Sequence, residues 1–154
     1  MVESPAIGVP KVRRMIAADV DTVATIEGAT FSSPWKADTF LHLLDGSGPE
    51  LWVLDLEGDG VVGYAVLWCI LDEAELANIA VDARFRGRGW GRLLLEALLE
   101  RARERGVKTV YLEVRVSNEG AMRLYLDFGF EKVGVRRDYY TRPREDAVMM
   151  ARRM

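Results

Sequence analysis

The sequence has little of the chemistry on which many enzymes depend. Its 154 residues include one cysteine, Cys69, and one histidine, His42. A single cysteine excludes an intrachain disulfide, and a single histidine excludes a cluster of several histidine metal ligands. No motif around Cys69 supports covalent catalysis by a cysteine nucleophile. We therefore expect no metal and no covalent enzyme intermediate.

Long hydrophobic runs and an excess of positive charge are also missing. No apolar run approaches the roughly 20 residues that a membrane span needs. The first ten residues contain Glu3, Pro5 and Pro10 and lack the apolar block of a secretory signal. The 21 Lys and Arg residues against 24 Asp and Glu residues give a net charge of −3, which argues against sequence-independent nucleic-acid binding. We expect a cytoplasmic protein with no membrane or nucleic-acid partner.

What is present is the composition and periodicity of a globular α/β domain. Residues 1–10 are expected to form a flexible tail, and residues 11–154 one domain. Apolar periodicity predicts strands at 11–16, 51–56, 61–71, 75–81, 109–115, 130–136 and 147–151. It predicts helices at 19–29, 33–46, from about 92 to 106 and at 118–129. This order favours a mixed sheet with helices on both faces.

The most informative segment joins a predicted strand to a predicted helix and reads Arg86-Gly87-Arg88-Gly89-Trp90-Gly91-Arg92. A helix N-terminus offers free N–H groups, and glycines let the backbone approach a ligand closely. The arginines add local positive charge to an acidic protein, so we predict a phosphate-bearing ligand. Neither the Walker pattern nor the dinucleotide pattern is met. A glycine-rich turn with solvated arginines is the alternative interpretation.

Residues 81–91 resemble the pyrophosphate loop of the GCN5-related N-acetyltransferase (GNAT) superfamily. Its pattern, Arg/Gln-x-x-Gly-x-Gly/Ala, is matched by Arg86, Gly89 and Gly91, and the element order matches over about residues 11–152. Trp90 departs from the family, which more often has an aliphatic residue there. The resemblance implies a GNAT fold with one mostly antiparallel sheet.

The resemblance also implies a binding site for acetyl-coenzyme A as cosubstrate. The loop residues Arg86, Gly87, Arg88, Gly89, Trp90, Gly91 and Arg92 would hold the pyrophosphate. The preceding strand, with Ile79, Ala80 and Val81, would pair with the pantetheine arm and supply a backbone N–H for the thioester oxygen.

Five further segments resemble the RimI branch of this superfamily. They are residues 71–81, 112–118, 124–125 together with 128–130, 136–140 and 145–147. RimI enzymes acetylate the N-terminal alanine of a small-subunit ribosomal protein, so the resemblance implies a protein N-α-acetyltransferase with such an acceptor. Archaeal and eukaryotic N-terminal acetyltransferases share much of this pattern, which makes the branch less specific than the superfamily.

Acetyl transfer to an amine needs a base for the amine and an acid for the leaving thiolate. Glu113 lies mid-strand, where burial would raise its pKa toward that of a useful base. The alternative is a carboxylate paired with Arg115 or another cation. Tyr125 lies on the apolar stripe of its helix and equally suits a core tyrosine. The family resemblance places the base at Glu113 and the acid at Tyr125.

Asn118 is predicted to cap the helix that carries Tyr125, and it matches a coenzyme contact of the family. The acceptor site is predicted from the same resemblance. Aromatic and proline residues in two loops match the peptide-binding walls of N-terminal acetyltransferases; they are Phe31, Pro34, Trp35, Tyr139 and Tyr140. Ordinary loop packing is the alternative interpretation of these five residues.

Two other functions remain open from the sequence. A relative could acetylate a small-molecule amine or a lysine side chain instead of a protein N-terminus. A non-catalytic module could bind acetyl-coenzyme A as a sensor, although the pairing of Glu113 with Tyr125 favours an enzyme.

Overall fold

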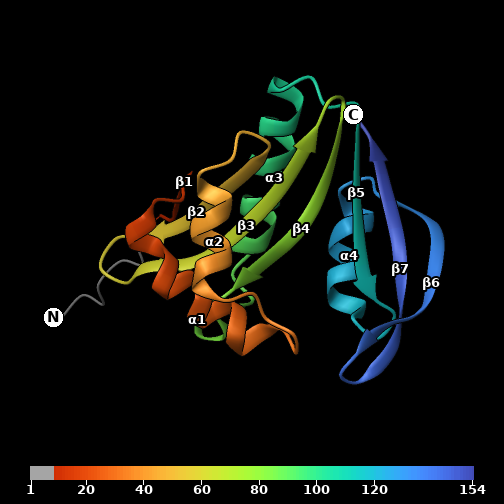
Figure 1. Cartoon of the computed structure of the whole chain (residues 1–154), viewed down its shortest axis with the longest axis horizontal. Helices are drawn as coiled ribbons and strands as arrows, with labels where there is room; N and C mark the ends of the chain where they lie inside the picture. The colour runs from red at the N-terminus through yellow and green to blue at the C-terminus, as the bar shows by residue number, and fades with distance from the viewer. Residues whose placement is uncertain (1–8) are drawn as a thin grey trace, which may run out of the picture.

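The computed structural model describes residues 9–154, which form a seven-stranded sheet with helices on both faces (Figure 1). The strands are β1 (Lys11–Arg14), β2 (Pro49–Leu56), β3 (Gly60–Ile70), β4 (Glu73–Val81), β5 (Thr109–Arg115), β6 (Glu131–Thr141) and β7 (Arg144–Arg153). The α-helices are α1 (Val20–Thr30), α2 (Ala37–Leu44), α3 (Trp90–Glu104) and α4 (Glu119–Asp127). The predicted α/β class is confirmed. Most of the predicted tail, residues 1–8, lies outside the described residues.

Within residues 9–154 the sheet has one parallel junction, and the sheet divides there. Its strand order is β1-β2-β3-β4-β5-β7-β6, and all neighbours are antiparallel except β4 and β5. Residues 73–75 of β4 pair with residues 109–111 of β5, and the ladder ends there. Figure 1 shows the two strands diverging from that point. The second half of β4 therefore has β3 on one side and an open space on the other.

The two faces of the sheet are covered differently. The predicted leucine stripe of α3 is buried, and it shares one core with α4, β4, β5 and β7. On the other face, α1 and α2 pack against β2, β3 and β4. Figure 1 shows α1 and α2 in front of that half of the sheet only. The front of β5 and β7 is left without a helix in the described chain.

A β-bulge in β4 changes which face its side chains reach. Leu67 pairs with Leu76 and Val66 pairs with Asn78, so Ala77 is an extra residue in β4. Such an extra residue reverses the alternation of the strand. Leu76 accordingly lies in the core under α3, whereas Ala80 lies in the core under α1 and α2.

The second helix begins later than the sequence predicts. Its first residue is Ala37, and Ser33 and Pro34 belong to the loop before it. The Trp35 N–H donates to the buried carboxylate of Glu27 at 2.9 Å, and the Trp35 ring packs edge-on against Phe40. Contacts with α1 and with the core therefore decide the path of this loop, in place of the local Ser-Pro start signal.

The first helix also starts differently from the prediction. Asp19 was expected to cap it, but the Asp19 side chain makes no cap hydrogen bond. Its carboxylate instead accepts from the Arg13 guanidinium at 2.8 and 2.9 Å and from the Ile16 N–H at 2.9 Å. The ion pair with β1 replaces the cap, and a 3-10 turn at Ala17–Asp19 leads into α1.

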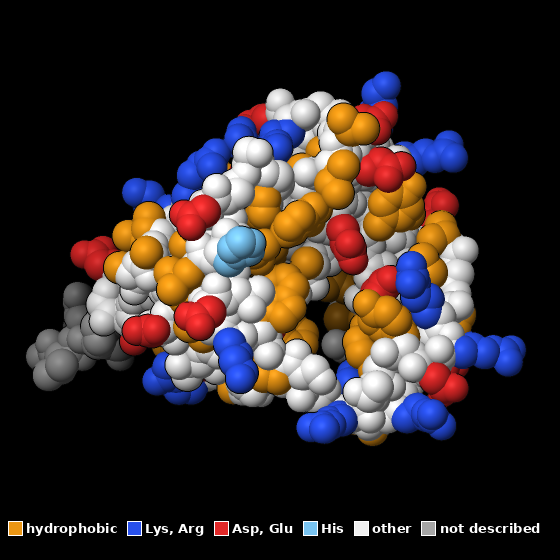
Figure 2. All heavy atoms as spheres, in the orientation of Figure 1, with side chains coloured by type: hydrophobic (Ala, Val, Ile, Leu, Met, Phe, Trp, Pro, Cys, Tyr) orange, Lys and Arg blue, Asp and Glu red, His pale blue; other side chains and the backbone are white. Residues whose placement is uncertain are grey.

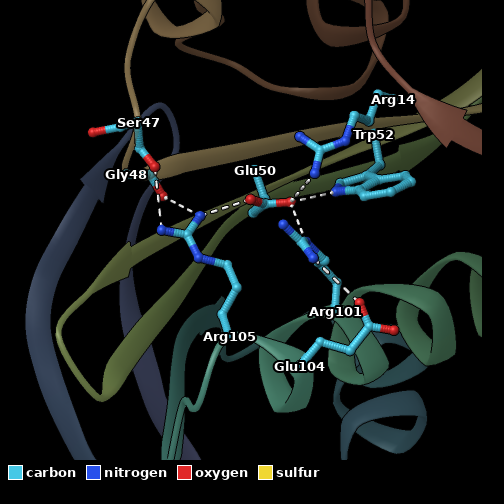
Figure 3. Close-up of polar contacts among 8 residues, drawn as sticks. All are labelled: Arg14, Ser47, Gly48, Glu50, Trp52, Arg101, Glu104 and Arg105. Carbon is cyan, nitrogen blue, oxygen red and sulfur yellow. Dashed lines mark hydrogen bonds and ion pairs between the residues drawn. The ribbon is translucent and has the colours of Figure 1, made fainter.

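Glu50 on β2 is a buried carboxylate that joins the sheet to α3 (Figure 3). Arg105 donates to it at 2.6 Å, Arg101 at 2.9 Å and the Trp52 indole at 3.1 Å. Burial works to raise the pKa of Glu50, but the hydrogen bonds from Arg101 and Arg105 hold that pKa below its ordinary value. The pairing satisfies a charge that would otherwise be costly to bury.

Candidate functional site

The divergence of β4 from β5 opens a cleft of about 900 Å³. Its sides come from β4, β5, α4, the loop between α1 and α2, and the hairpin of β6 and β7. Figure 2 shows the front of the molecule hollowed between its two halves at this place. Because backbone and side chains from both halves meet here, the cleft is the candidate active site.

Glu113 lies on β5 at this cleft and is partly buried. Its carboxylate is 3.1 Å from the Nε of Arg136, whose side chain is half-exposed. The hydrogen bond between Tyr139 and Glu113 raises the pKa of Tyr139 to about 12, with burial adding to the effect. The sequence left an ion pair of Glu113 with Arg115 or another cation as the alternative to a free base. Such an ion pair is present, and its cation is Arg136.

Tyr125 reaches the cleft from α4, on the side opposite the open face of the sheet. It is 7% exposed, and burial raises its pKa to about 12, with a smaller contribution from Tyr140. A tyrosine with this pKa keeps its proton at neutral pH. Asn118 caps α4 as predicted, since its side chain accepts from the Ala121 N–H at 3.1 Å, and it also lines the cleft.

Four of the five predicted acceptor residues line the cleft. Phe31 and Trp35 come from the loop between α1 and α2, and Tyr139 and Tyr140 come from β6. Pro34 lies in the same loop but does not line the cleft. Strands β6 and β7 run longer than predicted, and their hairpin carries the two tyrosines over β5.

Arg115 connects the two loops that form the mouth of this cleft. Its guanidinium donates to the Ser32 hydroxyl at 3.0 Å on one side. On the other side it donates to the carbonyl oxygens of Arg142 and Pro143 and to the carboxylate of Glu145, at 3.0 to 3.2 Å. The same group lies 4.2 Å from the ring of Tyr140. These contacts fix the separation of the two cleft walls.

The Gly/Arg loop, residues 86–92, runs from the end of β4 into α3. Gly87 and Gly89 have φ of +80° and +79°, values that favour glycine. Apart from the adjacent residues and the backbone of the helix itself, nothing in residues 9–154 lies within 4 Å of the position that a Cβ would take at Gly87, Gly89 or Gly91. No side chain of the described chain caps the N-terminus of α3. The first N–H groups of that helix are therefore left without a side-chain acceptor beside an uncrowded loop, as an anion site requires.

The arginines of this loop have different partners. Arg92 pairs with Asp127 at 2.5 Å, and Arg86 donates to the Val81 carbonyl oxygen at 2.9 Å. Arg88 lies against the rings of Phe85 and Trp90, which stack on each other. Trp90 thus packs against the loop itself. Among the described residues, Arg86 and Arg88 have no carboxylate partner.

The strand predicted to hold the pantetheine arm is only partly on the cleft. Ile79 lines it, whereas the side chain of Ala80 is buried in the core under α1 and α2. Val81 contacts the Gly/Arg loop, since its carbonyl oxygen accepts a hydrogen bond from Arg86. The cleft lining includes none of the loop residues 86–92, which lie beyond the end of β4.

Sequence reasoning missed Glu27, which forms the floor of the cleft. This carboxylate is 1% exposed, and it accepts from the Tyr64 hydroxyl, from the Asn78 amide at 2.7 and 3.0 Å and from the Trp35 N–H. Burial and the hydrogen bond to Glu27 raise the pKa of Tyr64. The signal was available, since Glu27 falls four residues after Val23 on the buried stripe of α1.

Residues 9–154 contain neither a group of metal-ligating side chains nor a membrane-spanning helix. No cluster of three or more His, Cys, Asp or Glu side chains that could hold a metal ion occurs in that range. No helix among the same residues is long and apolar enough to cross a membrane.

Comparison with known proteins supports an acetyltransferase site. Residues 20–130 match the model of the acetyltransferase (GNAT) family. The chain is 40% identical over 136 residues to the ribosomal protein bS18-alanine N-acetyltransferase of Escherichia coli K12. That alignment covers 86% of this chain and 90% of the relative.

Solved structures agree with this match. The ribosomal-protein-S18-alanine N-acetyltransferase of E. coli superposes with a TM-score of 0.85 at 36% identity, covering 94% of this chain and 93% of the other. Ard1 from Thermoplasma volcanium superposes with a TM-score of 0.86 at 29% identity, covering 95% and 98% of the two chains. The cleft between β4 and β5 therefore lies in a fold shared with N-acetyltransferases.

Proposed function

Because the chain belongs to the acetyltransferase (GNAT) family, we propose that it transfers an acetyl group from acetyl-coenzyme A to the N-terminal alanine of ribosomal protein bS18. The observation that carries the proposal is the similarity to the ribosomal protein bS18-alanine N-acetyltransferase of E. coli, which is 40% identical over most of both chains. The open cleft with Glu113 on one strand and Tyr125 beneath supports the same reaction.

In this proposal the cleft supplies one group for each proton that moves. The α-amine nitrogen attacks the thioester carbon, a C–N bond forms, and the C–S bond breaks. Glu113 takes the proton that the amine loses, directly or through a water. An α-amine has a pKa of about 7.7–8.0, so a minority is already neutral at pH 7 and a moderate base suffices.

Tyr125 is assigned the opposite role of proton donor to the departing sulfur. Its pKa of about 12 keeps the hydroxyl protonated over the neutral range. Since it is almost completely buried, a thiolate that forms beside it would have little water to stabilise it. A hydroxyl at this place can therefore stabilise the leaving group with a hydrogen bond and then a proton.

The coenzyme is assigned to the open end of β4 and the Gly/Arg loop. The N–H groups at the start of α3, with Arg86 and Arg88, would hold the pyrophosphate. The edge of β4 that lacks a partner, including Ile79, Ala80 and Val81, offers backbone groups to the pantetheine arm and to the thioester oxygen. Asn118 would add a polar contact while it caps α4.

The acceptor is assigned to the mouth of the cleft. Phe31, Pro34 and Trp35 would form one wall, and Tyr139 and Tyr140 the other. Tyrosine pairs pack against an extended peptide and hydrogen-bond to its backbone at the same time. Arg115 holds the walls together through Ser32 and the hairpin carbonyls.

The deciding experiment is the release of free thiol from acetyl-coenzyme A with a peptide of the bS18 N-terminus. The control is the same peptide blocked at its α-amine. Release that requires the free α-amine is expected. Equal release from the blocked peptide would assign the activity to a lysine side chain. Coenzyme binding without release from either peptide would favour a small-amine acceptor or a sensor.

A further inference from the structure

A second, smaller hollow of about 270 Å³ adjoins the cleft on the front of the sheet. Strand register places Trp68, Glu75 and Tyr111 side by side on β3, β4 and β5. The same register places Glu113 beside Met149. Side chains of paired residues point to the same face, so this hollow lies on the half of the front that α1 and α2 leave uncovered.

Large apolar side chains are exposed on this face. Ile70 is 62% exposed, and Trp68 and Tyr111 are each more than one-third exposed. Figure 2 shows such side chains next to acidic ones on the front of the molecule. A group of exposed aromatic and aliphatic side chains, unlike a single one, is typical of an interaction surface.

The charged residues of the hollow are mainly acidic. Glu73 and Glu75 are exposed, and no Lys or Arg pairs with either among the described residues. The lining also includes Glu113, which forms an ion pair with Arg136, the one basic residue of the lining in the described chain. Three carboxylates against one guanidinium leave a negative potential over an apolar floor. Such a surface suits a polypeptide that carries both basic and apolar side chains.

The hollow and the cleft adjoin, because Glu75 and Glu113 line both. Thr109, the register partner of Glu73, lies four residues before Glu113 on β5. This separation is about 13 Å at the rise of a strand. An extended chain spans it with about four residues. An acceptor whose amine lies at Glu113 can therefore place its next residues along this face.

We propose that the front surface formed by Trp68, Ile70, Glu73, Glu75 and Tyr111 binds the acceptor polypeptide downstream of its first residues and selects acceptors with basic side chains there. This inference rests on the proposed transfer to a protein N-terminus. The cleft recognises the α-amine, and the front surface reads the chain that follows it.

The test compares acceptor peptides that all begin with alanine. One is a tripeptide, too short to reach the front surface. Two longer peptides differ in having lysine or serine at about positions 4 to 6. For the wild-type protein, kcat/KM should be about tenfold higher for the lysine peptide than for the serine peptide, mainly through KM, and the advantage should shrink in high salt.

The charge reversal Glu73→Lys should abolish that advantage and leave the tripeptide rate unchanged. Glu57→Lys is the matched control, since Glu57 is also exposed but lies in the turn between β2 and β3. Equal rates for the lysine and serine peptides, or equal effects of the two substitutions, would overturn the inference while the transfer itself stands. No thiol release from any of the three peptides would overturn the proposed function instead.

Discussion

The Gly/Arg loop and the floor of the cleft are built in opposite ways. The loop consists of seven consecutive residues, 86–92, and its glycines have open space around them. The floor consists of Glu27, Trp35, Tyr64 and Asn78, which come from α1, a loop, β3 and β4 and meet around one carboxylate. A ligand site at the surface can be encoded locally, whereas a buried polar centre needs the whole fold.

This difference predicts how each region responds to substitution. A change in the loop should affect ligand binding and leave the core intact, because little packs against it. A change in the floor should affect stability and acceptor geometry together, because the same hydrogen bonds hold β4 and the loop between α1 and α2. Substitutions in the two regions test this separation.

Gly89→Glu should lower the affinity for acetyl-coenzyme A by about a thousandfold, because a carboxylate would oppose the pyrophosphate at the start of α3. Calorimetry measures the affinity. Gly58→Glu is the matched control, since Gly58 also has a positive φ of +92° in open space but lies in the turn between β2 and β3. Similar coenzyme affinity in the two variants would remove the pyrophosphate from this loop.

Glu27→Ala should lower the free energy of unfolding by about 3 kcal/mol, because it leaves the buried Tyr64 hydroxyl and the partly buried N–H donors of Asn78 and Trp35 without an acceptor. Urea unfolding measures this. Acceptor KM should rise in the same variant, since Trp35 and Asn78 lose their positions. A stable variant with unchanged acceptor KM would show that the floor does not organise the cleft.

Glu50→Ala provides the matched comparison for that result. It removes the other well-buried glutamate, whose carboxylate Arg101 and Arg105 share. Glu50 does not line the cleft. Glu50→Ala should therefore lower the free energy of unfolding, while the acceptor KM of the folded protein stays unchanged.

Glu113→Gln should lower kcat by about a hundredfold at pH 6, with coenzyme affinity retained. The loss should narrow toward pH 9, because the α-amine has a pKa of about 7.7–8.0 and is then already neutral. Rates of acetyl transfer across this range measure the effect. A constant ratio of wild-type to variant rate over the whole range would exclude Glu113 as the base.

Tyr125→Phe should change the response of stability to alkaline pH. The pKa of Tyr125 is raised to about 12 in the folded protein, so the unfolded chain, with a pKa near 10, loses its proton first. Unfolding is therefore favoured as pH rises from about 10 to 12, by about 1 kcal/mol at pH 11. The variant has no hydroxyl to ionise at this position, so its free energy of unfolding should fall by that much less at pH 11. The measurement is the free energy of unfolding of the wild-type protein and the variant at pH 8 and at pH 11. An equal loss of stability in the two proteins would contradict the prediction.

Several elements could be predicted because their signals are local. The Asn118 cap, the buried stripe of α3 and the strand that carries Glu113 all follow from spacing within one segment, and the structure confirms them. The predicted start of α2 was wrong because a contact with a distant segment decides it. Ser33 and Pro34 form a good local start signal, but a hydrogen bond from Trp35 to a residue on another helix overrides it.

The sequence by itself determined the α/β order of elements, the Gly/Arg loop and the family that this loop indicates, since each depends on residues close together in the chain. Only the tertiary structure decided the rest. The early end of the β4–β5 ladder opens the cleft, the bulge at Ala77 turns Asn78 toward Glu27, and the uncovered half of the sheet adjoins Glu113. These features depend on strand register and on which layers meet. They arise from packing between distant segments, which no local pattern records.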